Sequence, residues 1–408
     1  MIKKLLKDYS LWVAIVFALM DLSGLVGQIG FQLYYPLLFF LAFLGITRYK
    51  KINTIYVLYI VACFLSIITN NIPSFYKIHF RFGAFIVLFL AFTPLLNSRY
   101  LAIVRTKAIQ YFCLFSVGVV VINFLIFKGG GTSVYQSALY ENIGMYTGST
   151  ANNQMGMLGG VSLIYLSTLL CYKNQIEKKW FYLFLILLFC TLAMTFLASS
   201  RSAVLCAVAS ILGLLYVKYK RKFGKLLGIL CIIVIVGGVV APIFDDYTRG
   251  IIEFKQGGDL SSFDTKSRDG LWELRIKEFK SSPITGIGFG TISNPGEFTK
   301  RSGIVETGSS WLASLSQTGL LGTIPILVIV IGNLLYILKL KEPDFIQTLF
   351  SGMTIFFTIH PMAEGYITTV GAILCVLFWC IHGVVYSMRT KVFLTSDIPL
   401  LFIKEKKK

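Results

Sequence analysis

A single arginine interrupts an apolar run in the stretch LASSRSAVL, residues 197–205. A guanidinium group holds a phosphate through two parallel hydrogen bonds, and neighbouring hydroxyl groups can complete such a site. An arginine at bilayer depth is costly, so Arg201 must either reach a lipid phosphate or bind an anion of its own. Both interpretations stay open here. The hydroxyl groups beside it are those of Ser199, Ser200 and Ser202.

The longest polar segment, residues 245–308, contains a predicted helix in SRDGLWELRIKEFKSSP. The pattern begins at Ser267, a suitable N-cap, and ends before Pro283. Arg268 and Arg275, seven residues apart, are expected to share one face of this helix. Its apolar residues recur at helical spacing, which predicts an amphipathic helix near a membrane surface. They are Trp272, Ile276 and Phe279.

Glycines at positions 286, 288 and 290 follow in ITGIGFGTI. Their spacing is not GxGxxG and no strand-to-helix unit surrounds them, so they predict tight turns rather than a nucleotide site. In the next segment, VETGSSWLASLSQTGLLG, a helix is expected to begin at Thr307 or Ser309, with Trp311 as an interfacial anchor. Glu306 is then either a proton acceptor at a cavity mouth or an ordinary exposed loop acid.

Further polar residues lie near the ends of apolar runs. In IHPMAEGYITT, His360 is expected to cap a helix or to contact substrate. Glu364 is expected to face a cavity or to pair with Arg201 or Arg268. Arg81, near the start of another run, faces the same cavity or contacts a lipid headgroup.

The whole chain has the composition of a membrane protein. Of its 408 residues 56% are hydrophobic and 14% charged, and the mean hydropathy is +0.74. This excludes an ordinary soluble protein and predicts an all-α, polytopic membrane bundle. A span needs about 20 apolar residues, and about twelve runs qualify. They are 9–28, 31–47, 53–70, 81–97, 108–127, 154–172, 180–198, 202–217, 226–244, 319–338, 345–361 and 366–388.

The distribution of charge predicts the orientation. A net charge of +19 would suit a nucleic-acid partner, but the positive-inside rule explains it better, so no nucleic acid is expected. Alternate connections and both chain ends carry 25 of the 38 lysines and arginines, which places both termini in the cytoplasm. The expected organisation is transmembrane helices 1 to 9 in residues 1–244, an extracytoplasmic catalytic loop at 245–308, and transmembrane helices 10 to 12 with a basic cytoplasmic tail in 309–408.

Taken in order, GSTANNQMG, SSRSA, RDGLW, SSPITGIGFG and SSWLASLSQTGLLG resemble the O-antigen ligase and Wzy-type polysaccharide polymerase superfamily. The resemblance covers residues 148–366. It implies a GT-C-like glycosyltransferase of the bacterial cytoplasmic membrane that uses undecaprenyl-diphosphate-linked glycans. It also implies that Arg201 and Arg268 engage the donor diphosphate, and that Asn153 belongs to the family's glycine-asparagine segment.

The chain departs from the family pattern at one place. Family ligases carry a His-Asn pair about eleven residues before the glycine matched by Gly319, and this chain has Gly308 and Ser309 there. Glu306 is the nearest group able to accept a proton. The missing histidine favours a polymerase of capsule, O-antigen or exopolysaccharide repeat units over a ligase.

The expected reaction is glycosyl transfer with loss of a polyprenyl diphosphate. No metal or other cofactor is expected, because the arginines supply positive charge at the leaving group and no His or Cys cluster has metal-ligand spacing. The expected partners are the lipid-linked oligosaccharide, membrane lipids, and the flippase and chain-length regulator of the same pathway. Two other classes stay open: a flippase or transporter, against which the lack of internal repeats counts, and a non-catalytic scaffold of envelope assembly.

Overall fold

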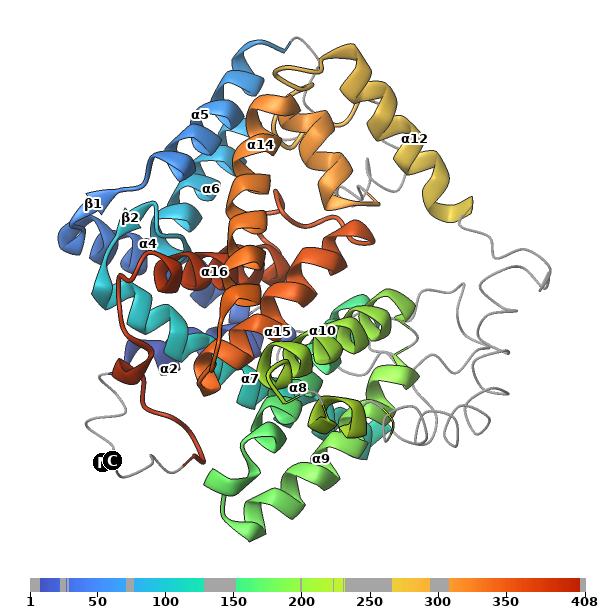
Figure 1. The fold of residues 1–408 in the computed structure, drawn as a ribbon. Coiled ribbons are helices and arrows are strands. Elements are labelled where there is room, and N and C mark those ends of the chain that lie inside the picture. The colour runs from blue at the N-terminus through green and yellow to red at the C-terminus, as the bar shows by residue number, and fades with distance from the viewer. Residues whose placement is uncertain are drawn as a thin grey trace.

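The computed structural model describes residues 8–22, 27, 29–70, 77–127, 152–198, 200–222, 224–229, 231, 266–293 and 308–403. Within these residues the chain is almost wholly helical, as expected (Figure 1). The principal helices are α2 (Tyr9–Asp21), α4 (Ile29–Arg48), α5 (Thr54–Ile68), α6 (Ile78–Phe92), α7 (Arg99–Phe127), α8 (Asn152–Cys171), α9 (Lys178–Leu197), α10 (Arg201–Tyr219), α12 (Lys266–Ser281), α14 (Ser310–Lys339), α15 (Phe345–Ile359) and α16 (Ile373–Arg389). The short elements are β1 (Lys51–Ile52), β2 (Leu96–Asn97), η1 (Lys173–Gln175), η2 (His360–Met362) and η3 (Thr395–Asp397).

Six of the described helices are long and apolar enough to cross a membrane, which fits a multi-pass membrane protein. They are Ile29–Arg48, Arg99–Leu125, Asn153–Cys171, Lys178–Leu197, Ser202–Tyr219 and Ser310–Lys339. The expected count of about twelve spans is not confirmed. In two places the apolar run extends beyond the helix that it predicted. α6 ends at Phe92, inside the run 81–97, and α16 begins only at Ile373, inside the run 366–388. Most of the run 226–244 lies outside the described residues.

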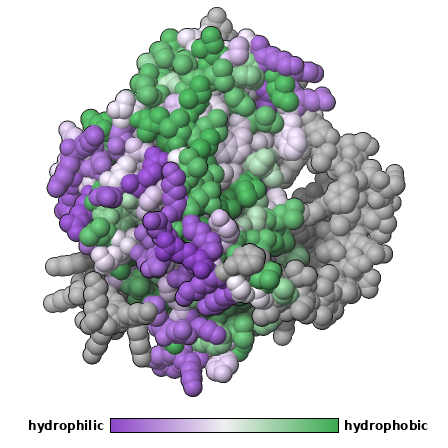
Figure 2. Space-filling model, viewed as in Figure 1, coloured by the Kyte–Doolittle hydropathy of each residue, from purple (hydrophilic) through white to green (hydrophobic). Residues whose placement is uncertain are grey.

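Connections that are rich in basic residues meet at one end of the bundle, here called the basic end. β1 pairs antiparallel with β2, which joins the connection after α4 to the one before α7. The Tyr172 hydroxyl donates to the Pro343 carbonyl oxygen at 2.7 Å, and Arg99 pairs with Asp397 at 2.9 Å. Figure 2 shows hydrophilic surface at the left and in the lower centre, separated by hydrophobic surface from a second hydrophilic area over α12.

An aromatic core joins α5, α6 and α16. The buried Trp379 ring lies 4.5 Å from the Phe89 ring and 5.2 Å from the Tyr59 ring, measured between centroids. The indole N–H of Trp379 donates to the Ile367 carbonyl oxygen at 2.9 Å. The core therefore also orders the chain between η2 and α16, which is not helical.

At the other end of the bundle, α14 is kinked at Gly319 (φ 59°, ψ −162°). The kink frees backbone groups of α14 to bond the chain that follows α12. The Leu320 N–H donates to the Pro283 carbonyl oxygen at 2.9 Å, and the Ile287 N–H donates to the Ser316 carbonyl oxygen at 2.7 Å. α12, at the upper right of Figure 1, is thereby anchored on α14.

Candidate functional site

The turn between α9 and α10 carries the first candidate residues. α9 ends at Leu197 and α10 begins at Arg201, each one residue from the end of its predicted run, with Ser200 as the N-cap residue. At its other end α10 reaches the basic end, where the Lys218 ammonium donates to the Pro343 carbonyl oxygen at 3.2 Å. Arg201 therefore begins α10 at the end remote from the basic connections.

The first turn of α10 can attract an anion. Its N–H groups lack partners within the helix, and the helix dipole adds positive potential there. Ser200 is only 4% exposed, and its hydroxyl has no hydrogen-bond partner among the described residues.

The start of α8 packs directly against the start of α10. A Cβ atom on Gly156 would lie 2.5 Å from the Cβ of Ser200, so glycine permits the close approach. Asn153 is exposed one turn earlier in α8. Two helix starts that are far apart in the sequence are thus adjacent, and both belong to segments that the motifs singled out.

A buried acid that sequence reasoning missed lies beside α8. Asp21, the last residue of α2, is fully buried, and the Gln154 carboxamide donates to its Oδ1. Its Oδ2 has no hydrogen-bond partner among the described residues. The signal was in the sequence, because Asp21 is the only acid in the run 9–28 and an acid within a span is a functional candidate.

The predicted helix in the long polar segment is confirmed as α12, with two differences. It begins before Ser267, so that residue is not its N-cap. Ile276 was expected on the apolar face but is 42% exposed. Trp272 does face the protein, and its indole N–H donates to the Gly308 carbonyl oxygen at 3.2 Å.

A buried ion pair explains the altered face of α12. Arg275 is 1% exposed, and its Nη1 lies 2.8 Å from Glu278 Oε2. Glu278 Oε1 accepts from the backbone N–H of Ser293 at 2.9 Å and from its hydroxyl at 2.7 Å. Burial lowers the pKa of the Arg275 guanidinium, and the neighbouring Glu278 acts in the opposite direction. The pair therefore ties α12 to the chain that follows it.

The glycine-rich chain after α12 makes tight turns, as predicted. Gly286, Gly288 and Gly290 have φ values of 75°, 117° and 69°. Side chains of α5 and of the residues just after it hold these turns. The Asn70 carboxamide donates to the Gly286 carbonyl oxygen at 3.2 Å, and the Phe289 N–H donates to Ser66 Oγ at 3.0 Å.

The start of α14 agrees with one of the two predicted positions. Ser309 is the N-cap, and its hydroxyl accepts from the Leu312 N–H at 3.5 Å. The indole N–H of Trp311, which was expected as an interfacial anchor, donates to the Thr358 carbonyl oxygen of α15 at 3.1 Å. Protein contacts therefore hold this ring.

His360 and Glu364 lie where α15 gives way to the non-helical chain before α16. His360 is the C-cap of α15 and is fully buried, with Nδ1 3.2 Å from the Tyr366 hydroxyl. Ser310 Oγ donates to the Glu364 carbonyl oxygen at 2.6 Å and accepts from the Tyr366 N–H at 2.7 Å. The Glu364 backbone is thus joined to α14, and its side chain is half-buried.

The remaining candidates divide into two groups. Ser199 and Glu306 lie outside the described residues, as do the side chains of Arg201 and Arg268. Ser202, partly buried, follows Arg201 in α10. Arg81 is half-buried in α6, which packs against α4, α5 and α16. The structure therefore joins the α8 and α10 segments and places Arg81 on a different set of helices.

Residues 183–327 match the model of a protein family described as O-antigen ligase. The match covers 145 of the 408 residues and includes α9, α10, α12 and the first part of α14. It is consistent with the O-antigen ligase and Wzy superfamily that the motifs indicated, and it includes Arg201, Arg268 and Glu306. No curated protein matches the chain.

Proposed function

We propose that this chain, which carries an O-antigen ligase domain at residues 183–327, polymerises polyprenyl-diphosphate-linked oligosaccharide repeat units on the outer face of the bacterial cytoplasmic membrane. Members of the family are membrane glycosyltransferase-like enzymes that act on lipid-linked glycans. One observation carries the proposal. Within this domain, an arginine begins a membrane helix at the end of the bundle remote from the basic connections. At this position the guanidinium group of Arg201 and the N-terminus of α10 together favour the binding of a diphosphate.

In the proposed reaction an acceptor hydroxyl attacks the anomeric carbon of the donor sugar. The bond between that carbon and the diphosphate oxygen breaks, and polyprenyl diphosphate leaves with the bonding electrons. Arg201 and Arg268 stabilise the charge that grows on the leaving group. Glu306 accepts the proton of the acceptor hydroxyl. No metal is required in this scheme, because the two arginines supply the positive charge.

Other residues contact the substrate or hold the site in shape. Ser199, Ser202, Asn153 and Glu364 are proposed to bind diphosphate or sugar hydroxyl groups. Buried groups act by positioning: Ser200 packs the start of α10 against Gly156 of α8, Arg275 fixes α12 through Glu278, and His360 orders the chain around Glu364.

The second candidate is a ligase that transfers a finished glycan to a different acceptor, and the description of the matched family favours it. Against it stands the sequence at Gly308 and Ser309, where family ligases carry a His-Asn pair. In either case we propose cytoplasmic termini, and a flippase and a chain-length regulator as pathway partners.

The decisive experiment uses the purified full-length protein in lipid vesicles with a synthetic lipid-linked repeat unit. A ladder of products on a gel, each longer by one unit, is the result expected of a polymerase. A single transfer that occurs only when a separate acceptor is added would establish the ligase. Movement of the intact lipid across the vesicle membrane, without new glycosidic bonds, would contradict both and establish a transporter.

A further inference from the structure

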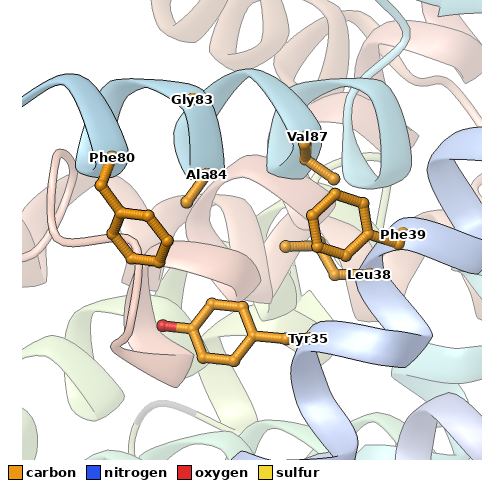
Figure 3. A pocket seen from close by; sticks show the side chains of 7 residues that line it. All are labelled: Tyr35, Leu38, Phe39, Phe80, Gly83, Ala84 and Val87. Atoms are coloured by element: carbon orange, nitrogen blue, oxygen red, sulfur yellow. The ribbon is translucent and has the colours of Figure 1, made fainter.

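An apolar groove lies between α4 and α6, far along the chain from the O-antigen ligase domain. Its cavity volume is about 320 Å³, near the lower end for ligand pockets. Figure 3 shows Phe80 and Val87 of α6 on one side, with Phe39 and Tyr35 of α4 opposite them. Phe39 and Phe80 are 60% and 66% exposed, so the groove opens on the flank of the bundle. A hydrocarbon chain is the ligand that such a lining accepts.

The groove covers the middle of α4 and α6 and extends toward the end remote from the basic end, because Val87 at its near side lies only five residues before the end of α6. α4 ends at Arg48, next to β1, and Phe39 lies nine residues earlier, about 14 Å along the helix axis. α6 ends at Phe92, near β2, and Phe80 lies twelve residues earlier, about 18 Å along the axis. In the proposed orientation the far end of the groove, at Tyr35 and Phe80, lies toward the outer leaflet, where we place the lipid-linked substrates.

Basic residues stand at the outer end of the groove. Lys77 is the N-cap residue of α6, and both Lys77 and His79 are exposed. His79 precedes the groove residue Gly83 by four positions and Arg81 precedes Ala84 by three, so the two basic residues flank the lining on opposite sides, in the first turns of α6. The positive-inside rule disfavours basic residues on the outer side. The sequence has no Asp or Glu from residue 22 to residue 140, so the charge of these basic residues is not offset by an acid from the same part of the chain. A lipid phosphate complements that charge.

We propose that the groove binds the isoprenoid tail of a second lipid-linked substrate, the acceptor, with its diphosphate at Lys77, His79 and Arg81. The proposal rests on the proposed polymerase, since joining two repeat units brings together two molecules that each carry a diphosphate and a tail. One site at Arg201 holds only one of them. A ligase whose acceptor lacks a polyprenyl chain has no use for a second site.

The packing of the helices supports two separate lipid sites. α10 packs against α8, α9 and α15, whereas α4 and α6 pack against each other and against α2, α5, α7 and α16. The opposite face of α6 nevertheless touches the chain that follows α12. The Phe289 ring lies 4.9 Å from the Phe85 ring and 5.8 Å from the Phe82 ring, measured between centroids. An acceptor held in the groove of α6 thereby lies across that helix from the chain that follows α12.

The experiment is photo-crosslinking of the full-length protein in vesicles. The probe is a polyprenyl diphosphate without sugar that carries a photoreactive group in its tail, and labelled peptides are identified by mass spectrometry. Gly83→Leu fills the groove, and Gly118→Leu in α7 is the matched control. Both glycines are exposed in helices, and a Cβ atom at either would meet no heavy atom within 4 Å. The first side-chain atom therefore enters open space at both positions.

We expect the probe to label α4 and α6. Excess polyprenyl diphosphate without the photoreactive group should abolish this labelling, whereas excess phosphatidylglycerol should not. Gly83→Leu should weaken that labelling on the order of tenfold, the scale of a lost fit in an apolar pocket, while Gly118→Leu and Arg201→Lys keep it. Equal competition by phosphatidylglycerol, or labelling that Gly83→Leu leaves unchanged, would overturn the proposal. The product ladder of the wild-type protein is scored separately, so a failed polymerase and a failed groove give different results.

Discussion

Gly156 of α8 and Ser200 of α10 are in direct contact, and a Cβ atom at position 156 would lie 2.5 Å from Ser200 Cβ and 2.9 Å from Ser200 Oγ. A larger residue must push the two helix starts apart, at a cost of about 1–3 kcal/mol, and move Arg201. We expect Gly156→Val to insert into the membrane normally and to lose most of its polymer elongation, measured as product length on a gel. Gly118→Val, with open space above it, is the control. Equal elongation by both variants would show that this contact does not position Arg201.

The proposed grip of Arg201 on a diphosphate depends on the shape of the guanidinium as well as its charge. We expect Arg201→Lys to lower the rate of elongation by on the order of a hundredfold, as loss of a transition-state hydrogen-bond donor does. The control is Arg221→Lys, because Arg221 forms a solvent-exposed pair with Glu342 at the basic end. A full-length ladder from Arg201→Lys would remove the diphosphate grip from the mechanism.

The buried pair Arg275 and Glu278 should behave as a unit. Glu278→Leu leaves a guanidinium buried without its counter-charge, and such a change costs about 3–5 kcal/mol. We expect a marked fall in the thermal unfolding temperature of the detergent-solubilised protein. Arg275→Met combined with Glu278→Leu should recover part of the loss, since no charge then stays buried. A double variant as unstable as the sum of the single ones would contradict the coupling.

The kink at Gly319 requires glycine for two reasons. Its φ of 59° is strained for other residues, and a Cβ atom there would lie 2.3 Å from the Ile284 carbonyl oxygen. We expect Gly319→Ala to detach the chain after α12 from α14, seen as faster limited proteolysis between these helices and weaker elongation. Gly371→Ala, where a Cβ atom meets no heavy atom within 4 Å, is the matched control and should digest like the wild type.

The C-terminal segment should loosen in acid. The Arg99 guanidinium donates a hydrogen bond to the Asp397 carboxylate, and the Leu394 N–H donates a second one. Both hydrogen bonds lower the pKa of the Asp397 carboxyl below its usual 3.8. A lowered carboxyl pKa adds stability above the unfolded value, and the gain disappears as the pH falls through the folded value. We expect the unfolding temperatures of the wild type and Asp397→Asn to differ by a constant amount from about pH 7 to about pH 5, and to converge below about pH 4. A gap that widens in acid would refute the assignment.

Much of the helical framework follows from the sequence, because its signals are local. Apolar runs and breaker residues placed α8, α9 and α10, and cap residues marked the start of α14 at one of two predicted positions and the end of α15 at His360. The start of α7 was not placed, because its first nine residues, 99–107, are rich in basic residues and were expected to form a connection. The turns at the three glycines after α12 were also predictable, since glycine is the residue that adopts positive φ at little cost. Each of these features depends on only a few neighbouring residues.

Tertiary structure decided which of these residues meet. The Asp21 carboxyl and the Gln154 carboxamide are separated by 133 positions, and nothing in either apolar run indicates that they touch. Arg275 has the spacing of a residue that shares the Arg268 face, but the packing of α12 on α14 buries it against Glu278. The hydropathy of a segment indicates the average environment of its side chains, whether lipid, water or protein, but not the environment of each residue. Which helix covers which face depends on the fit of side chains from distant segments, and that fit appears only when the whole bundle has formed.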